Sequence, residues 1–425
     1  MVPEAPPARR RFRPGPARPG TARSAFSHRN FRAVWTANFL SSVGGWMQNV
    51  VLPAYVYART DSASILAAFV FAQLGPLLLL SVPGGVMADR VDRRTWLLSA
   101  QAVQLSSSIL LGVFTALDSS LLLLFLAQLG VGVGNALNAP AFSAVMPSLV
   151  PPADLGGSIS LSSVSVNGSR VVGPVIVAVI MSWGVTPAQV FFLNAATYLF
   201  VVRTLARVPL PPNSERKESG WRSFSLGFRT AREKPVIGRI LLSMTTFSLI
   251  SLPFVGLFAA VAAKNFDIQP RTSTYKWLYA TWGLGAMFGA LSVGTVLAAM
   301  DKRRTAQWGF VAFAATMTFF AFSSSTVPAF VTGFFLGASY FATTTSLLTV
   351  LQGRLELEIR ARVLALWFMA FGGTVPLGNL IFGPVMDAIG ARPVLLLGAV
   401  WALVLAWWCD IVRIDTRTGD TAPVL

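Results

Sequence analysis

The 425-residue chain has few charged residues: Asp, Glu, Lys and Arg make up 12% of it, whereas apolar residues make up 54%. Soluble proteins carry about 25% charged residues, so this chain has too little charge to cover a water-soluble globule. Disordered chains are poor in apolar residues, which excludes disorder of the chain as a whole. The composition therefore predicts a polytopic membrane protein.

Cysteine and histidine are almost absent, with Cys409 and His28 the single examples of each. One cysteine cannot form an intrachain disulfide or a cysteine zinc site. One histidine is too few for a histidine metal site, and Ser-His or Cys-His catalysis lacks its parts. The chain also has no Gly-x-x-x-x-Gly-Lys-Ser/Thr loop for binding ATP phosphates. We therefore expect no enzyme, no metal and no cofactor.

Long charge-free runs are the dominant pattern, and a membrane-spanning helix needs about 20 apolar residues. The runs cover residues 33–58, 62–88, 95–117, 119–153, 155–202 (interrupted only by Arg170), 240–263, 277–300, 305–353, 363–386 and 393–409. Two runs are too long for one helix; one breaks at Gly184 and Pro187, the other at residues 323–325 and Pro328. The pattern predicts an all-α membrane protein of twelve transmembrane helices.

The basic residues are unevenly placed between these runs. With a cytoplasmic N-terminus, 28 of the 34 Lys and Arg residues lie on the cytoplasmic side and five on the outer side, with Arg170 in neither group. Lys and Arg favour the cytoplasmic side, so both termini are predicted to be cytoplasmic and the membrane to be the inner, cytoplasmic membrane of the cell. The net charge of +17 then indicates a basic face beside anionic lipid rather than nucleic-acid binding.

The spans divide the chain into two halves that echo each other. Asp89-Arg90 and Asp301-Lys302 each follow a predicted span and lie 212 residues apart, whereas Gly173-Pro174 and Gly383-Pro384 lie 210 apart. The predicted parts are a disordered basic tail (1–28), a six-helix half (29–208), a cytoplasmic linker with an amphipathic helix (209–235), a second six-helix half (236–413) and a C-terminal tail (414–425). Such pseudo-repeats indicate a transporter with its substrate site near the membrane midplane.

Residues 85–94, Gly-Val-Met-Ala-Asp-Arg-Val-Asp-Arg-Arg, resemble the signature loop of the major facilitator superfamily, Gly-x-Leu-Ala-Asp-Arg/Lys-x-Gly-Arg/Lys-Arg/Lys. Met87 and Asp92 depart from the usual Leu and Gly. Further short matches resemble the enterobactin-exporter and macrolide-efflux branch; they are Asn30-Phe31-Arg32, Asp154-Leu155, Asn167-x-x-Arg170-Val-Val-Gly173-Pro174 and Arg360-Ala361-Arg362-Val363. The resemblance, over about residues 29–413, implies alternating-access export coupled to protons, with no oligomer required.

The signature loop is the first candidate functional element. The residues assigned to it are Gly85, Asp89, Arg90, Arg93 and Arg94, with Asp301 and Lys302 from the truncated second copy. One acid among several bases can hold helices in one state and release them in the other, and a helix N-terminus favours the anion. The alternative is that these arginines only fix the topology.

The motif in the fifth predicted helix contains Asn167, Arg170, Gly173 and Pro174. Pro174 removes a helix hydrogen bond and Gly173 permits close packing, which gives either a gating hinge or an ordinary kink. Arg170 lies near the bilayer centre, where a charge costs about 2.5–3.5 kcal/mol and must face the protein or a wet cavity. None of the 17 acids falls at mid-span. Arg170 therefore either bonds to neighbours such as Asn167 or helps bind acidic, oxygen-rich substrates.

Polar residues in predicted helices 1, 4, 7 and 10 form the third candidate element, since these helices line the cavity in the resembled family. The candidates are Asn38, Gln48, Asn49, Asn135, Asn138, Thr245, Tyr340 and Thr343. Each could instead make a hydrogen bond between helices. The sequence predicts a secondary exporter of a small amphipathic molecule such as a drug, siderophore or secondary metabolite. An importer, or a membrane sensor or structural protein without transport, remains the alternative.

Overall fold

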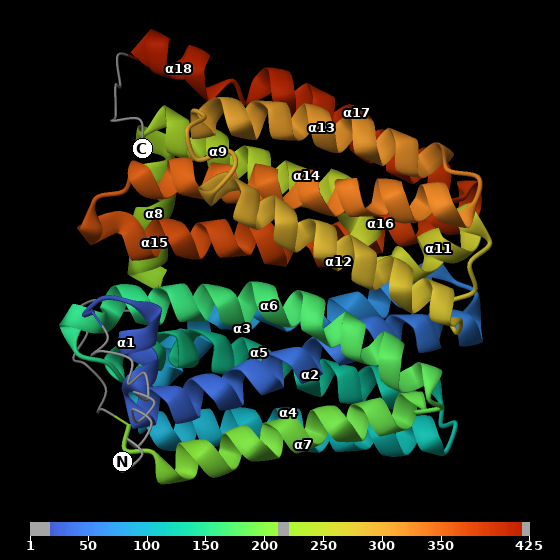
Figure 1. Cartoon of the computed structure of the whole chain (residues 1–425), viewed down its shortest axis with the longest axis horizontal. Coiled ribbons are helices and arrows are strands. Elements are labelled where there is room, and N and C mark those ends of the chain that lie inside the picture. Colours follow the sequence, from blue (N-terminus) through green and yellow to red (C-terminus); the bar gives the residue numbers. More distant parts are fainter. Residues whose placement is uncertain (1–17, 211–220, 419–425) are drawn as a thin grey trace, which may run out of the picture.

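The computed structural model describes residues 18–210 and 221–418, and in this part of the chain the regular structure is entirely helical (Figure 1). The first half contains α1 (Ala22–Ser27), α2 (Arg29–Thr60), α3 (Ala63–Arg90), α4 (Arg93–Ala116), α5 (Leu121–Ser148), η1 (Pro152–Asp154), α6 (Leu155–Ser182) and α7 (Pro187–Arg207). The breaks at Gly184 and Pro187 are therefore where the sequence predicts them.

The second half is less regular. It contains α9 (Pro235–Thr246), η2 (Phe247–Ser251), α10 (Pro253–Gly256), α11 (Phe258–Phe266), α12 (Ser273–Gly294), α13 (Lys302–Phe322), α14 (Thr326–Gly353), α15 (Leu357–Phe368), η3 (Met369–Gly373), α16 (Thr374–Ile389), α17 (Ala391–Trp408) and α18 (Ile411–Thr418). The predicted spans 240–263 and 363–386 are each interrupted by a π-helical turn, η2 and η3. Such turns open the backbone ladder and occur frequently at functional sites.

Nine helical segments of the described residues are long and apolar enough to cross a membrane. The predicted spans 33–58, 240–263 and 277–300 are not among the nine, although α2, α9 to α11 and α12 occupy them. Polar residues such as Gln48 and Asn49 lower the apolar character of α2, and Lys276 does so in α12, whereas the π-helical turn η2 divides span 240–263 into short helices. Twelve membrane crossings and cytoplasmic termini therefore stay a prediction.

The two halves lie side by side, with the first half below the second in Figure 1. Most helices of both halves run roughly along the horizontal axis of that view. Glycines bring backbones together inside the second half, because a Cβ at Gly289 or Gly337 would meet main-chain atoms of the neighbouring helix. Small residues permit such close approach where lipid provides no hydrophobic drive between helices. Between the halves, α3 lies against α16 and α6 against α12.

The predicted disordered tail differs from the structure at its end. Residues 1–17 lie outside the described part, but Ala22–Ser27 form α1, which packs on the start of α6. The buried carboxylate of Asp154 accepts hydrogen bonds from the Gly20 N–H (2.9 Å), and the His28 Nε2 lies 2.7 Å from it. These contacts order a segment whose composition alone resembles a solvated tail.

The linker contains α8 (Trp221–Glu233), which lies where the sequence predicts an amphipathic helix, whereas residues 211–220 lie outside the described part. It crosses the ends of the second half beside α15 (Figure 1). Lys234 follows it and bonds to Glu356 at 2.9 Å. The linker is therefore attached to the second half.

The predicted C-terminal tail also begins with ordered structure. Asp415 of α18 is buried and pairs with Arg303 at 2.8 Å and with Arg354. Arg303 also donates to Asp301, and these hydrogen bonds lower the pKa of the Asp301 carboxyl, which stays ionised at neutral pH. Hydrophobicity along the sequence gives no sign of this buried ionic cluster, because its members are far apart in the chain.

We expect Asp415→Asn to lower the apparent melting temperature of the detergent-purified protein by several degrees. Removing one partner of a buried ion pair costs about 3–5 kcal/mol, because the remaining charges stay buried. Asp410→Asn is the matched control: the Asp410 carboxylate caps the Arg413 N–H at 3.1 Å in an exposed position, and asparagine caps equally well. Equal melting temperatures for both variants would contradict a stabilising role for Asp415.

Candidate functional site

Arg170 of α6 lies between aromatic rings from both halves. Its guanidinium carbon is 5.5 Å from the ring centroid of Trp46 on α2 and 4.7 Å from that of Phe341 on α14. The Nε atom is buried and has no hydrogen-bond partner among the described residues. Asn167, proposed as a neighbour for Arg170, donates instead to the Ser163 carbonyl one turn earlier. The guanidinium thus keeps an unused donor at the interface between the halves.

Glycines on two helices fix this position. A Cβ at Gly173 would lie 2.6 Å from the Cβ of Trp46, so the absence of a side chain lets α6 pack directly on α2. A Cβ at Gly283 of α12 would lie 3.1 Å from the Arg170 carbonyl oxygen. The close approach of three helices at Arg170 places the charge where the halves meet. Pro174 is buried in the same turn.

An aromatic cluster on the second half surrounds the site. Tyr340 is stacked with Trp282 (centroids 6.3 Å apart) and with Phe371 (6.3 Å), and contacts Phe341 edge-on at 4.4 Å. The Trp282 Nε1 is also buried without a partner. The cluster meets Arg170 through Phe341, and a planar guanidinium beside aromatic rings is suited to a flat, oxygen-bearing anion.

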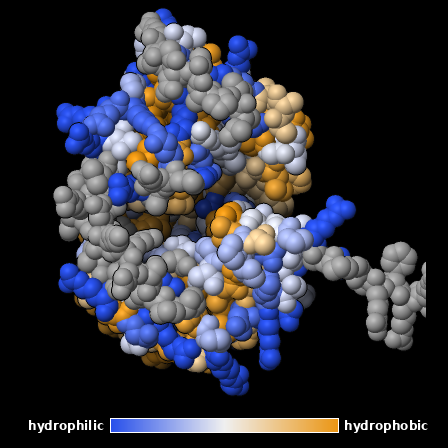
Figure 2. Space-filling view, turned by 90° about the vertical axis from the view of Figure 1, so that its left-hand side faces the viewer, coloured by the Kyte–Doolittle hydropathy of each residue, from blue (hydrophilic) through white to orange (hydrophobic). Residues whose placement is uncertain are grey.

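The molecule is hollowed between the halves on the face that carries α1 and α18, here called the terminal face, as the space-filling view shows (Figure 2). The helix ends on this face belong to the predicted cytoplasmic side. Hydrophilic residues surround much of the hollow on this face. An amphipathic solute could enter the interface between the halves from this side.

The opposite end is closed by a carboxylate that bridges the halves. Asp387 of α16 accepts hydrogen bonds from the N-terminus of α3, namely from the Ala63 N–H (2.8 Å), the Ser64 N–H (2.8 Å), the Ser64 Oγ (2.7 Å) and the Ser62 Oγ (3.0 Å). Lys264 of α11 lies 3.4 Å from the same carboxylate. A helix N-terminus favours an anion, so Asp387 stabilises the closed end.

The candidate cavity residues fall into three groups. Gln48 and Thr343 are buried inside their own halves; Gln48 bonds to Gln128 (2.9 Å) and Asn194 (2.7 Å), and Thr343 bonds to the Ser339 carbonyl (2.7 Å). They do not face the interface between the halves in this structure. Tyr340 belongs to the aromatic cluster at Arg170, while the half-buried remainder are Asn38, Asn49, Asn135, Asn138 and Thr245.

Several half-buried members bond to neighbouring helices or to their own. Asn38 donates to Ser165 of α6 (3.4 Å), and Asn138 accepts from Gln101 of α4 (3.1 Å). Asn49 accepts from Gln73 of α3. Thr245 donates to the Leu241 carbonyl of its own turn (2.8 Å). Interhelical or local bonding therefore accounts for these polar side chains in this structure.

The signature-loop residues lie at the end of α3 and the start of α4. Gly85 lies within α3, and the side chain of Asp89 lies outside the described part. Arg90 is exposed, Arg93 is half-buried, and Arg94 donates to the Val208 carbonyl at 2.9 Å. The locking role of this loop stays a prediction.

The second copy of the loop begins earlier than the charge-free run 277–300 predicts. Helix α12 ends at Gly294 rather than at residue 300, and Lys302 bonds to the carbonyls of Leu297 (2.6 Å) and Ala298 (2.8 Å) in the turn that follows. Asp301 is the N-cap of α13, the place that Asp92 takes in α4. Asp301 and Asp92 thus share the N-cap position of the helix that follows each loop, and the pairing of Asp301 with Asp89 stays a prediction.

The fold is that of transporters of the major facilitator superfamily. The nucleoside transporter NupG covers 91% of this chain and 99% of its own with a TM-score of 0.74 at 13% identity. A bacterial homologue of the human lysosomal transporter Spinster, inward-facing and unoccupied, gives 0.68 at 14% identity, over 93% and 98% of the two chains. At these identities the likeness shows the fold.

Sequence comparison then gives the family. The chain belongs to the transmembrane secretion effector family, whose model matches residues 20–422. The enterobactin exporter EntS of Shigella boydii serotype 4 is 28% identical over 269 residues, which are 63% of this chain. The match spans 64% of the length of that exporter. The predicted superfamily is confirmed, and its members are transporters rather than enzymes.

Proposed function

We propose that this protein is a secondary active exporter of small, acidic, amphipathic molecules in the inner membrane. In this proposal the twelve predicted helices cross the membrane, both termini are cytoplasmic, and the hollow on the terminal face is the cytoplasmic entrance. The observation that carries the proposal is Arg170, held between Trp46 and Phe341 at the interface between the halves with a buried, unpaired Nε.

The charge balance of the interface supports an anionic substrate. A buried cation is costly unless an anion or hydrogen-bond acceptors compensate it. Within residues 18–210 and 221–418, no carboxylate lies within ion-pair distance of Arg170. The aromatic rings around it stabilise the cation only in part, by about 0.5–2 kcal/mol each. A substrate carboxylate, sulfonate or phenolate would supply the missing partner.

The closed outer end and the open terminal face support alternating access. At the closed end the polar contacts gather at Asp387 and the α3 N-terminus, so a rearrangement there is proposed to open it. The loop at the end of α3, with Asp89, is proposed to stabilise the opposite state, in which the terminal face closes. The EntS relative exports enterobactin, which agrees with outward transport of an oxygen-rich compound.

The direction and the driving force can be tested in cells that lack their main efflux pumps. Cells that produce the protein should accumulate less of acidic amphipathic compounds than vector controls, and a protonophore should abolish the difference if protons drive export. Neutral analogues should show a smaller difference between the two strains, and cationic analogues should accumulate equally in both. Higher accumulation of the acids in producing cells would identify an importer and overturn the proposal.

A further inference from the structure

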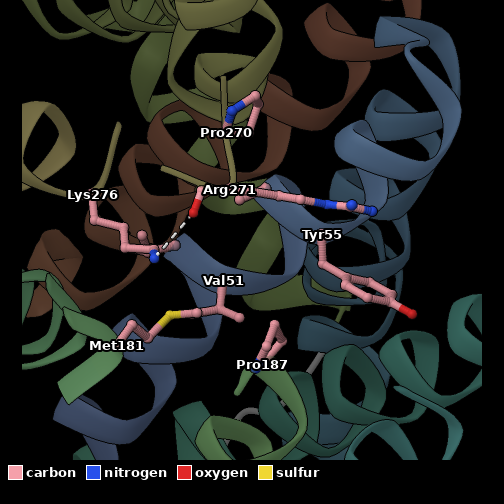
Figure 3. Close-up of a pocket in the computed structure, with 9 residues that line it drawn as sticks. Val51, Tyr55, Met181, Pro187, Pro270, Arg271 and Lys276 are labelled. Carbon is pink, nitrogen blue, oxygen red and sulfur yellow. Dashed lines mark hydrogen bonds between the residues drawn. The ribbon is translucent and has the colours of Figure 1, made fainter. Parts of the chain in front are cut away.

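A pocket lies between the halves, and Figure 3 shows the residues that line it. Its residues come from the outer parts of the helices, toward the closed end. Its volume is about 310 Å³. It is formed by the outer parts of α2, α6 and α12, the start of α7 and the loop before α12. Most of its walls are apolar, among them Val51, Met181 and Pro187. Lys276 and Arg271 are its two charged residues, and both are cationic.

Lys276 is buried, at 7% exposure, and its ammonium has little compensation. The Nζ donates to the Arg271 carbonyl oxygen at 3.3 Å (Figure 3), whereas an ammonium can donate three hydrogen bonds. Across the described residues no carboxylate forms an ion pair with Lys276 or with Arg271. Burying a charge without an opposite charge is unfavourable, so the pocket has a deficit of negative charge.

Lys276 is not needed to hold the neighbouring turn. Thr272 caps α12 by accepting from the Tyr275 N–H at 3.4 Å, and its hydroxyl donates to the Gln269 carbonyl at 2.6 Å. The turn before α12 therefore has its own hydrogen bonds. A purely structural role explains the burial of Lys276 poorly.

The residues that line the pocket lie on the same helix faces as Arg170 and its neighbours, farther along the helices. Met181 follows Arg170 by eleven residues, about three turns of α6, which places it on the same face roughly 16 Å farther out. Val50 follows Trp46 by four residues on α2. Lys276 precedes Gly283 by seven residues, about two turns of α12. Three helices thus align the pocket with the Arg170 site along the interface between the halves.

We propose that this pocket is a second anion-binding site, which receives the acidic group of the exported molecule after it leaves Arg170. The inference rests on the proposed function and adds a second site to it. Lys276 pairs with the carboxylate, sulfonate or phenolate, Arg271 adds positive charge at the rim, and the apolar walls contact the body of the molecule. With cations at Arg170 and at Lys276, an anion that moves along the interface between the halves would have a positively charged partner at each of the two sites.

Binding of 2-naphthoate and its neutral analogue 2-naphthamide to the full-length protein in lipid nanodiscs tests the pocket. The Arg170→Gln background removes the central site, so that remaining naphthoate binding reports on the pocket. In this background, Lys276→Met should weaken naphthoate binding about tenfold or more, as expected for loss of a charged hydrogen bond. Naphthamide binding should not change, which also shows that the variant is folded.

Arg392→Met is the matched control. Arg392 is another outer-end cation with carbonyl and aromatic partners, bonding to the Ala321 carbonyl at 3.0 Å, and it does not line the pocket. It should leave naphthoate binding unchanged. Equal naphthoate affinity with and without Lys276 would overturn the second site, as would parallel loss of both ligands with a lower melting temperature. In either case, the proposed function would stand if selectivity for acids still depended on Arg170. If the protein showed no selectivity for acids at all, the proposed function would fall as well.

Discussion

Arg170→Gln should reduce export of acidic compounds by about 10- to 100-fold while export of neutral analogues changes little. A hydrogen bond to a charged group contributes about 1.5–3 kcal/mol, and each 1.4 kcal/mol corresponds to a factor of ten. Glutamine keeps donors but removes the charge, so the loss should be selective for anions. The measurement is efflux of a matched acid and amide from loaded cells, normalised to the amount of protein in the membrane.

Arg170→Lys separates charge from shape. Lysine keeps the positive charge but lacks the planar fork that stacks between Trp46 and Phe341, so acid export should be retained in part. Gln128→Leu is the matched control, since Gln128 is a buried polar residue of the first half that bonds to Gln48 away from the interface. Any loss there should affect acid and amide equally. Equal loss of both compounds in Arg170→Gln, with falling protein levels, would show that Arg170 is structural.

Asp387→Asn should open the end of the molecule opposite the termini. The carboxylate accepts four hydrogen bonds from the start of α3, and an amide provides one acceptor and no charge. If the state that is closed at this end loses about 2–4 kcal/mol relative to the outward-open state, the equilibrium between the two shifts by roughly 30- to 1,000-fold. The population should therefore move strongly toward the outward-open state, and net export should fall.

Spin-label distances between the halves provide the measurement. Trp183 at the end of α6 and Val327 at the start of α14 are 79% and 73% exposed, and the one native cysteine, Cys409, is buried and can be replaced by serine. Longer Trp183–Val327 distances are expected in Asp387→Asn. Asp267→Asn is the control, because Asp267 caps α11 in the left-handed conformation (φ 55°), which asparagine also adopts. Unchanged distances in Asp387→Asn would show that this carboxylate does not hold the end closed.

Much of the fold could be predicted because charge interrupts hydrophobic runs at membrane surfaces. The breaks within runs 155–202 and 305–353 were predicted from turn residues, and the helices of the structure end there. The ordered parts of both tails were missed. Asp154 and Asp415 bind residues more than 60 positions away, and no local pattern reports such contacts.

The candidate site was predicted in part. Arg170 could be identified from the sequence because a charge in the middle of a membrane span is energetically unfavourable and is retained only where it has a role. The rings that enclose it come from α2 and α14, and their position depends on how the helices pack. Lys276 was overlooked because it begins a helix, where a charge is ordinary. The Ser62-x-Ser64 start of α3 is a helix-cap pattern, yet its true partner, Asp387, lies more than 320 residues away. Single polar residues such as Gln48 and Thr343 look alike in sequence whether they face a cavity or a neighbouring helix.

Uphill transport in inside-out membrane vesicles tests the central claim most directly. Acidifying the lumen imposes the gradient that a proton-coupled exporter would use, and passive partition of a weak acid would deplete it from the acidic side. The account predicts that 2-naphthoate accumulates in the acidic lumen above its external concentration, that 2-naphthamide accumulates less, and that Arg170→Gln abolishes the difference. Vesicles that show no uphill accumulation of the acid, or that concentrate a quaternary ammonium analogue instead, would contradict it.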